Sequence, residues 1–179
     1  MVYILLAPGF EEMEALVPAD LLRRAGIDTA LVSLDGELVP GGRNITVKAD
    51  LPLEGVKVED MELLMLPGGG VGVANLGADP RVEALVKRAA ASGKKLAAIC
   101  AAPSLLSKWG VLADKKAVCY PTWRDKLAGA RYQPGEKLAV DGDIVTGQAA
   151  GASFAFGLKL IEVLRGAEAA RKVREEIYL

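Results

Sequence analysis

A single cysteine, Cys100, stands where an apolar, strand-like stretch (KLAAIC, residues 95–100) runs directly into a helix-like one (AAPSLLSKWG, residues 101–110). A residue on such a turn projects its side chain outward, and a following helix favours a negative charge at its N-terminus. Both conditions expose a thiol and lower its pKa, so Cys100 is predicted to be a nucleophile. The competing interpretation is a small buried apolar residue, the usual state of a free cysteine. The chain contains no histidine, the base that commonly activates such a thiol.

Two further stretches follow strand-like segments and could act together with this cysteine: PGFEEMEA (residues 8–15) and LPGGG (residues 66–70). Glycines let the backbone come close to a bound group and expose N–H donors to an oxyanion. A phosphate cradle for a nucleotide is disfavoured, because neither G-x-G-x-x-G nor G-x-x-x-x-G-K-[ST] is present. The remaining alternative is a plain turn.

Three glutamates crowd the start of the helix-like segment that follows the first strand. Glu11 and Glu12 are expected to be at least partly solvated and to complement the helix dipole. Glu14 precedes the apolar run and could point back toward the strand ends. A carboxyl shielded from water there has a raised pKa and can carry a proton, which makes Glu14 a candidate acid–base group.

The elements that must position these groups alternate between strands and helices. The predicted strands are residues 2–7, 28–34, 61–66, 95–100 and 115–121, with a hairpin at 137–147 and an extended excursion or small hairpin at 44–55. The predicted helices are residues 11–26, 79–93, 101–110, 151–166 and 167–179. Pro18 implies either a bend in the first helix or a helix that begins near Val17.

This alternation predicts an α/β fold with a mostly parallel sheet between two helix layers, formed as one domain over residues 1–179. In such a sheet ligands bind at the carboxyl ends of the strands. PGFEEMEA, PGGG and Cys100 all follow strands, so they should converge at that edge. The convergence is a stronger indication of a site than any one stretch.

The composition excludes some classes of partner. Lys and Arg total 22 against 23 Asp and Glu, a net charge of −1, so no positive field exists for binding nucleic acid or an anionic membrane. Two cysteines do not make a disulfide framework, which favours a reducing compartment. The first residues lack a basic region before their short apolar run, so no signal peptide is expected, and we predict a cytoplasmic protein.

Four stretches together resemble the ThiJ/PfpI superfamily, and most closely its branch of parkinsonism-associated protein deglycases: APGFEEMEALVPADLLRRAGI, LPGGGVGVANL, AAICAAPSLL and GASFAFGLKLIEVL. The resemblance covers nearly the whole chain in order. It implies a flavodoxin-like three-layer sandwich, a homodimer, and a nucleophile elbow at Cys100. It implies no cofactor and no metal.

The resemblance also implies roles for particular residues. A protonated Glu14 would hydrogen-bond the Cys100 thiolate, and Arg43 would approach the site across the dimer interface. The oxyanion would be bound by backbone N–H groups of Gly68, Gly69 and Ala101. Tyr120 stands where relatives have a histidine, and it would serve as a donor. Peptidase and glutamine amidotransferase activities, which need a cysteine–histidine pair, are therefore disfavoured.

Two functions remain open. The first is a glyoxalase or deglycase that acts on methylglyoxal, glyoxal or their adducts, through Cys100 addition and Glu14 proton transfer. The second is an oxidative-stress sensor or chaperone-like protein in which Cys100 is oxidised to the sulfinate, with little or no turnover. The other thiol, Cys119, is predicted to pack in the core, because strand alternation turns it away from the side that Tyr120 faces.

Overall fold

The computed structural model describes residues 1–179 and is built around a seven-stranded sheet with the order β10-β11-β7-β6-β1-β2-β5. All neighbouring strands in this sheet run parallel except β10 and β11. The strands are β1 (Val2–Leu6), β2 (Thr29–Ser33), β5 (Leu51–Pro52), β6 (Leu63–Leu66), β7 (Lys95–Ile99), β10 (Leu138–Asp141) and β11 (Ile144–Gly147). The predicted α/β class is confirmed.

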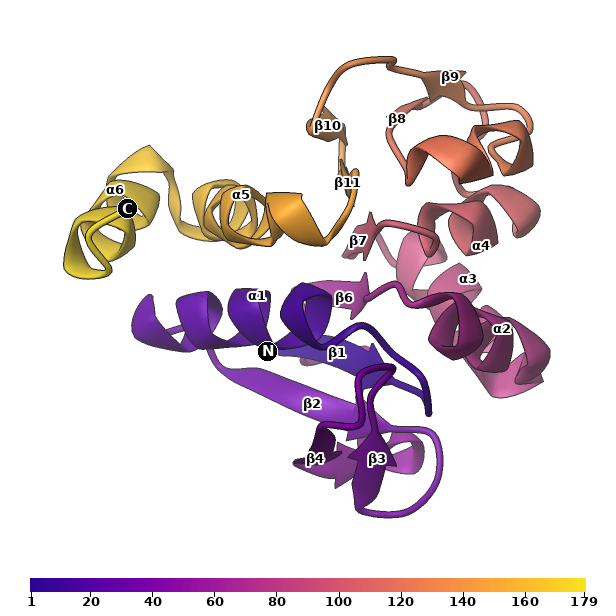
Figure 1. Cartoon of the computed structure of the whole chain (residues 1–179), viewed down its shortest axis with the longest axis horizontal. Helices are drawn as coiled ribbons and strands as arrows, with labels where there is room; N and C mark the ends of the chain where they lie inside the picture. Colours follow the sequence, from indigo (N-terminus) through magenta and orange to yellow (C-terminus); the bar gives the residue numbers. More distant parts are fainter.

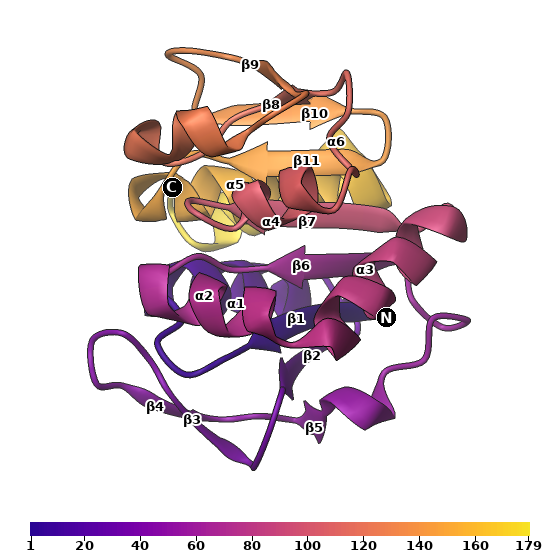
Figure 2. The same cartoon turned by 90° about the vertical axis from the view of Figure 1, so that its right-hand side faces the viewer.

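Helices cover both faces of the sheet (Figures 1 and 2). One face carries α1 (Glu12–Arg24), α5 (Ser153–Arg165) and α6 (Ala167–Glu176); the other carries α2 (Gly70–Ala78), α3 (Pro80–Ala91) and α4 (Pro103–Lys108). Two apolar clusters of 28 and 23 buried residues fill the two sides. In β1, Tyr3 and Leu5 belong to one cluster and Ile4 to the other, which explains why the strand is apolar at every position.

Smaller elements sit outside the main sheet. Strands β3 (Leu38–Pro40) and β4 (Thr46–Lys48) form an antiparallel hairpin, and β8 (Lys116–Ala117) pairs in parallel with β9 (Arg131–Tyr132). Short 3-10 turns are η1 (Leu53–Gly55), η2 (Pro121–Lys126) and η3 (Ala150–Ala152). The strand predicted over residues 115–121 is thus much shorter than expected. No helix in the chain combines the length and the apolar character needed to cross a membrane.

The sequence left open where the helix that contains Pro18 begins. α1 begins at Glu12 and continues through Pro18 to Arg24, so the alternative start near Val17 is wrong. A Cβ on Gly157 of α5 would lie 3.1 Å from the Pro18 Cα, so the two helices approach closely there. α1 therefore packs closely against α5 at the position where proline removes one of its backbone donors.

Helix α2 was not predicted, because its sequence GVGVANLGA is poor in helix formers. Its glycines permit tertiary contacts: a Cβ on Gly72 would lie 2.7 Å from the Phe10 Cα, in the loop after β1. Tertiary packing therefore overrides propensity at this helix. For α3 the predicted start is confirmed, since the Asp79 side chain caps it by accepting from the Arg81 N–H at 2.9 Å.

Candidate active site

Cys100 sits directly after β7 at the carboxyl edge of the sheet, on a strained turn. Its φ of 66° lies in the left-handed region that a residue with a side chain seldom adopts. Its N–H donates to the carbonyl of Gly147 at 2.9 Å, and its carbonyl accepts from the N–H of Tyr120 at 2.8 Å. These two bonds, to the end of β11 and to the segment after β8, fix the sharp turn that the sequence predicted.

Glu14 is brought to the same place by the first turn of α1, and its side chain is only 1% exposed. Its Oε2 accepts from the N–H of Gly68 at 2.9 Å, directly after β6. The N–H of Glu14 in turn donates to the Oε2 of Glu11 at 2.8 Å, which caps the helix. A Cβ on Gly68 would lie 2.6 Å from the Cys100 Cβ and would collide with the Glu14 Oε2, so both side chains lie against this glycine.

The surroundings of the carboxyl and the thiol shift both of their pKa values. Burial raises the pKa of Glu14 to about 7, and the charge of Glu11 adds to that rise. Burial, together with the charge of an ionised Glu14, raises the pKa of Cys100 to about 12, although the N–H groups of Ala101 and Gly69 oppose the change. The predicted lowering of the Cys100 pKa by a helix N-terminus is wrong, because burial and the neighbouring carboxylate outweigh the favourable dipoles.

Because burial raises the pKa of both groups, Glu14 and Cys100 can together hold one proton and one negative charge once the first proton has left. Because the two groups are in contact, the first proton to leave belongs to the pair rather than to either residue. The charge can reside on the carboxylate beside a thiol, or on the sulfur beside a carboxylic acid that donates to it. The second arrangement is a nucleophile next to a proton donor.

The backbone donors expected around the sulfur divide into two roles. The N–H groups of Gly69 and Ala101 lie on the side of the Cys100 sulfur and lower the pKa of the thiol, which is the placement that an oxyanion site requires. The N–H of Gly68 is instead bound to Glu14, so it orients the carboxyl and is not open to substrate. Gly69 has a φ of 90°, and a Cβ there would lie 2.7 Å from the Glu11 N.

Glu12 differs from its predicted state and has a role that helix periodicity did not reveal. It is 4% exposed, and its Oε1 accepts from the N–H of Arg43 at 2.6 Å and of Ile45 at 3.4 Å. The expectation of a solvated Glu12 is wrong, because the loop between β3 and β4 folds over it. The carboxylate thereby ties that loop, and Arg43 with it, to the start of α1.

Arg43 lies apart from the thiol within this chain. Its side chain is exposed and lines a pocket of about 220 Å³ beside the glycine turn. The pocket is formed by Gly9, Phe10, Glu11, Glu12, Gly42, Arg43, Gly69, Gly70 and Val71. Cys100 is not among its lining residues, so the pocket adjoins the site from the side of α2.

Tyr120 and Cys119 occupy opposite environments. Tyr120 is 43% exposed, and its bond to Cys100 is made by the backbone N–H. Cys119 is fully buried, its Sγ donates to the Tyr120 carbonyl at 3.3 Å, and burial raises its pKa to about 11. The prediction that Cys119 packs in the core is confirmed.

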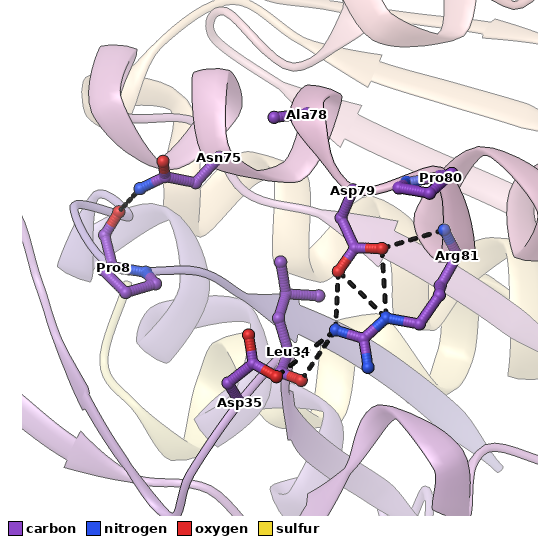
Figure 3. Close-up of a pocket in the computed structure, with 8 residues that line it drawn as sticks. All are labelled: Pro8, Leu34, Asp35, Asn75, Ala78, Asp79, Pro80 and Arg81. Atoms are coloured by element: carbon purple, nitrogen blue, oxygen red, sulfur yellow. Dashed lines mark hydrogen bonds and ion pairs between the residues drawn. The ribbon is translucent and has the colours of Figure 1, made fainter.

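A pocket of about 600 Å³ lies elsewhere, between the ends of β1 and β2 and the start of α3 (Figure 3). Its one guanidinium, that of Arg81, is bound by Asp79 at 2.7 Å and lies 3.4 Å from Asp35. The Asn75 amide donates to the carbonyl of Pro8 at 2.8 Å. Because these polar groups are bound to one another, they are not free to bind a ligand. Cys100 and Glu14 therefore remain the candidate reactive groups.

Comparisons with known proteins agree with this geometry. The model of the DJ-1/PfpI family matches residues 1–163. Protein dj-1beta of Drosophila melanogaster is 36% identical over 172 residues, which cover 95% of this chain and 92% of that protein. The glutathione-independent glyoxalase DJR-1.2 of Caenorhabditis elegans is 30% identical over 167 residues, covering 92% and 89%. The structure of oxidised Toxoplasma gondii DJ-1 has a TM-score of 0.94 at 35% identity, over 99% of this chain and 97% of that one. The chain therefore belongs to the DJ-1/PfpI family.

Proposed function

We propose that this protein is a cysteine-dependent glyoxalase of the deglycase type, which acts on small α-oxoaldehydes or their adducts. The observation that carries the proposal is the Glu14–Cys100 pair: a carboxyl that is 1% exposed and a partly buried thiol both lie against Gly68, and burial raises the pKa of each. The name of the Caenorhabditis elegans relative supports the same chemistry. Hydrolase and lyase descriptions both fit, depending on whether an adduct or a free aldehyde is the substrate.

The proposed reaction begins when the Cys100 thiolate adds to the aldehyde carbon of methylglyoxal and forms a C–S bond. Glu14 gives its proton to the resulting alkoxide, which yields a hemithioacetal. The Glu14 carboxylate then removes the proton from that carbon and returns it to the neighbouring carbon, the hydroxyl proton passes to the oxygen of that neighbouring carbon, and the N–H groups of Gly69 and Ala101 stabilise the intervening enediolate. Water hydrolyses the resulting thioester to lactate and restores the thiol; glyoxal gives glycolate in the same way.

The absence of a histidine affects the turnover rate that we expect for this protein. Tyr120 occupies its place and offers a phenol that donates a hydrogen bond but is a weak base at neutral pH. Proton transfer therefore falls to Glu14 alone. Turnover should be slower than in a site with a histidine, and peptidase chemistry, which needs a base to ionise the cysteine, is disfavoured.

We further propose a homodimer and a cytoplasmic location. Met13 and Phe154 begin α1 and α5 and are 47% and 44% exposed, while Ile45, in the loop held by Glu12, is 54% exposed. Apolar side chains left open at the start of two packed helices suit a subunit interface. A partner seated there would bring its own Arg43 near the site. Two free cysteines and no disulfide fit a reducing compartment.

The decisive experiment measures lactate formed from methylglyoxal by the wild type, Cys100→Ser and Glu14→Gln. Cys119→Ser is the matched control, because that thiol is buried in the core. We expect multiple turnovers in the wild type and the control, and loss of turnover in both site variants. A wild type without turnover would refute the proposal.

A second candidate is a redox sensor, alone or with a chaperone-like activity, and the same pair favours it. A hydroperoxide would take the Cys100 sulfur to the sulfenate and then the sulfinate, whose oxygens could accept a hydrogen bond from protonated Glu14. The oxidised Toxoplasma gondii relative makes this form relevant. Mass spectrometry should then find two oxygens added at Cys100 and none at Cys119, with no turnover of aldehyde.

A further inference from the structure

A second cavity lies away from the Cys100 site, between α2, α4 and η2. We call it the Trp123 pocket; it has a volume of about 390 Å³. It is lined by Val73, Ala74, Gly77, Ala78, Ser104, Leu105, Lys108, Trp123 and Lys126. None of the residues to which we assign chemistry lines it, so an inference about this pocket stands or falls separately from the proposed function.

The lining of the Trp123 pocket is largely apolar. Val73 and Leu105 are buried at its base, and the Trp123 indole is partly buried beside them. Small residues of α2 form one side: a Cβ on Gly77 would lie 2.7 Å from the Leu105 Cδ2, so α2 runs close to α4 there. A largely apolar pocket with small side chains and one indole suits a flat aromatic body, which packs well against an aromatic ring.

Both charged residues of the pocket are cations, and no carboxylate lines it. The Lys126 Nζ stands 3.9 Å from the centroid of the Trp123 ring. The lysines that pair with carboxylates are Lys48, Lys87, Lys95, Lys115, Lys159 and Lys172. Lys108 and Lys126 are not among them, so both ammonium groups are open to an external anion. Arg81 in the larger pocket of Figure 3 is, by contrast, already neutralised by its own carboxylates.

We infer that the Trp123 pocket binds a small aromatic acid in its anionic form. The aromatic ring of the ligand would lie in the Trp123 pocket, and its carboxylate would lie between Lys108 and Lys126. The hydroxyl of Ser104 is not free to serve such a ligand as a donor, because it donates to the Ala101 carbonyl at 2.7 Å. Charge complementarity therefore depends on the two lysines, and binding needs both the charge and the ring.

The test titrates the ¹⁵N-labelled full chain with 2-naphthoate and follows the two indole N–H signals by NMR. Trp109 is buried and serves as the internal reference, whereas Trp123 lines the pocket. We expect saturable shifts at Trp123 and none at Trp109. Uncharged 2-naphthylmethanol, which has the same ring, should bind about tenfold or more weakly, as expected when two charge contacts are lost.

Three variants sharpen the test. Lys108→Gln and Lys126→Gln should each weaken binding about threefold to fivefold, and Ala74→Met, at an exposed rim position, should block the pocket. Lys57→Gln, an exposed lysine outside the pocket, is the matched control and should leave the affinity unchanged. Absence of a Trp123 shift at millimolar 2-naphthoate, equal binding of the alcohol, or equal loss in Lys57→Gln would each overturn the inference.

Discussion

Glu14 and Cys100 meet across Gly68, a residue whose lack of a side chain leaves room for both. An added Cβ would lie 2.6 Å from the Cys100 Cβ and would overlap the Glu14 carboxylate. The same residue fixes the carboxyl, because its N–H donates to the Glu14 Oε2 at 2.9 Å. One glycine therefore sets both the separation of the reacting pair and the orientation of its acid.

The first prediction tests that spacing. Gly68→Ala should lower kcat/KM at least about 100-fold, the usual effect of displacing a reacting group by about an ångström. It should also lower the free energy of unfolding by about 1–3 kcal/mol through overpacking. Gly70→Ala is the control, because a Cβ there meets no atom within 4 Å. Lactate assays and urea unfolding measure both effects, and a fully active Gly68→Ala would contradict the close contact.

The second prediction concerns the pH dependence of thiol reactivity. The pair loses its first proton near pH 7, where the raised pKa of Glu14 lies. In a Cys119→Ser background, alkylation of Cys100 by iodoacetamide should rise about tenfold per pH unit below 7 and level off above it, because a fixed fraction of the singly charged pair then carries its charge on the sulfur. kcat/KM should follow the same curve. A single inflection near pH 12, where the thiol itself titrates, would mean that the proton stays on sulfur.

The third prediction links the Glu14 carboxyl to stability. Its pKa in the folded protein is about 7 against an ordinary 4.5, so its contribution is fully present below pH 4.5 and is lost as the pH rises through 7. Glu14→Gln does not ionise and keeps its stability across that window. Relative to the wild type, the variant should gain up to about 3 kcal/mol between pH 4.5 and 7.5, measured by urea unfolding. Glu59→Gln, at an exposed position, should show no such gain.

The fourth prediction addresses the missing histidine. Tyr120 is 43% exposed and bonds to Cys100 only through its backbone, so substitutions there should change stability by less than about 0.5 kcal/mol. Tyr120→His should raise kcat for lactate formation about tenfold or more, because it places a base beside the thiol. Tyr120→Phe, which removes only the hydroxyl, separates the effect of the donor from that of the ring. An unchanged rate in Tyr120→His would mean that its side chain does not reach the substrate.

The fifth prediction concerns assembly. Phe154→Lys places a charge at one of the three exposed apolar side chains assigned to the proposed homodimer interface, Met13, Ile45 and Phe154, and it should raise the Kd of that dimer about 100-fold or more. Analytical ultracentrifugation measures the change. Val140→Lys, at a similarly exposed apolar residue on the edge strand β10, is the control and should remain dimeric. A wild-type monomer at micromolar concentration would refute the assembly.

Much of the fold was readable from the sequence because its central strands are largely apolar and because particular residues mark where some elements begin or turn. Asp79 followed by Pro80 marks the start of α3, and Gly142 marks the turn between β10 and β11. Helix α2 was not predicted because its glycines disfavour an isolated helix. The same glycines allow the helix to pack closely against Phe10, a contact that exists only in the folded protein. Residues that are neighbours in the sequence indicate most of the helices and strands, whereas α2 depends on contacts with residues that are distant in the sequence.

The site was predictable to the same extent. The types and positions of Cys100 and Glu14 were enough to bring them to one edge of the sheet. The thiol's raised pKa was not foreseen, because burial and the charge of a neighbouring carboxylate depend on segments that are 86 positions apart in sequence. Glu12 was misjudged for a related reason: its partners, the N–H groups of Arg43 and Ile45, come from a loop that periodicity does not describe.

The bonds that hold Cys100 also bear on how the protein folds. Its N–H binds the end of β11 and its carbonyl binds the segment after β8, so the elbow closes only when distant strands have paired. Non-local pairing of parallel strands is slow, because chain entropy is lost before the contacts form. The active thiol should therefore be assembled late in refolding. Pulsed alkylation of Cys100 during refolding would then time the closure of the sheet, and recovery of activity should trail the recovery of helical signal.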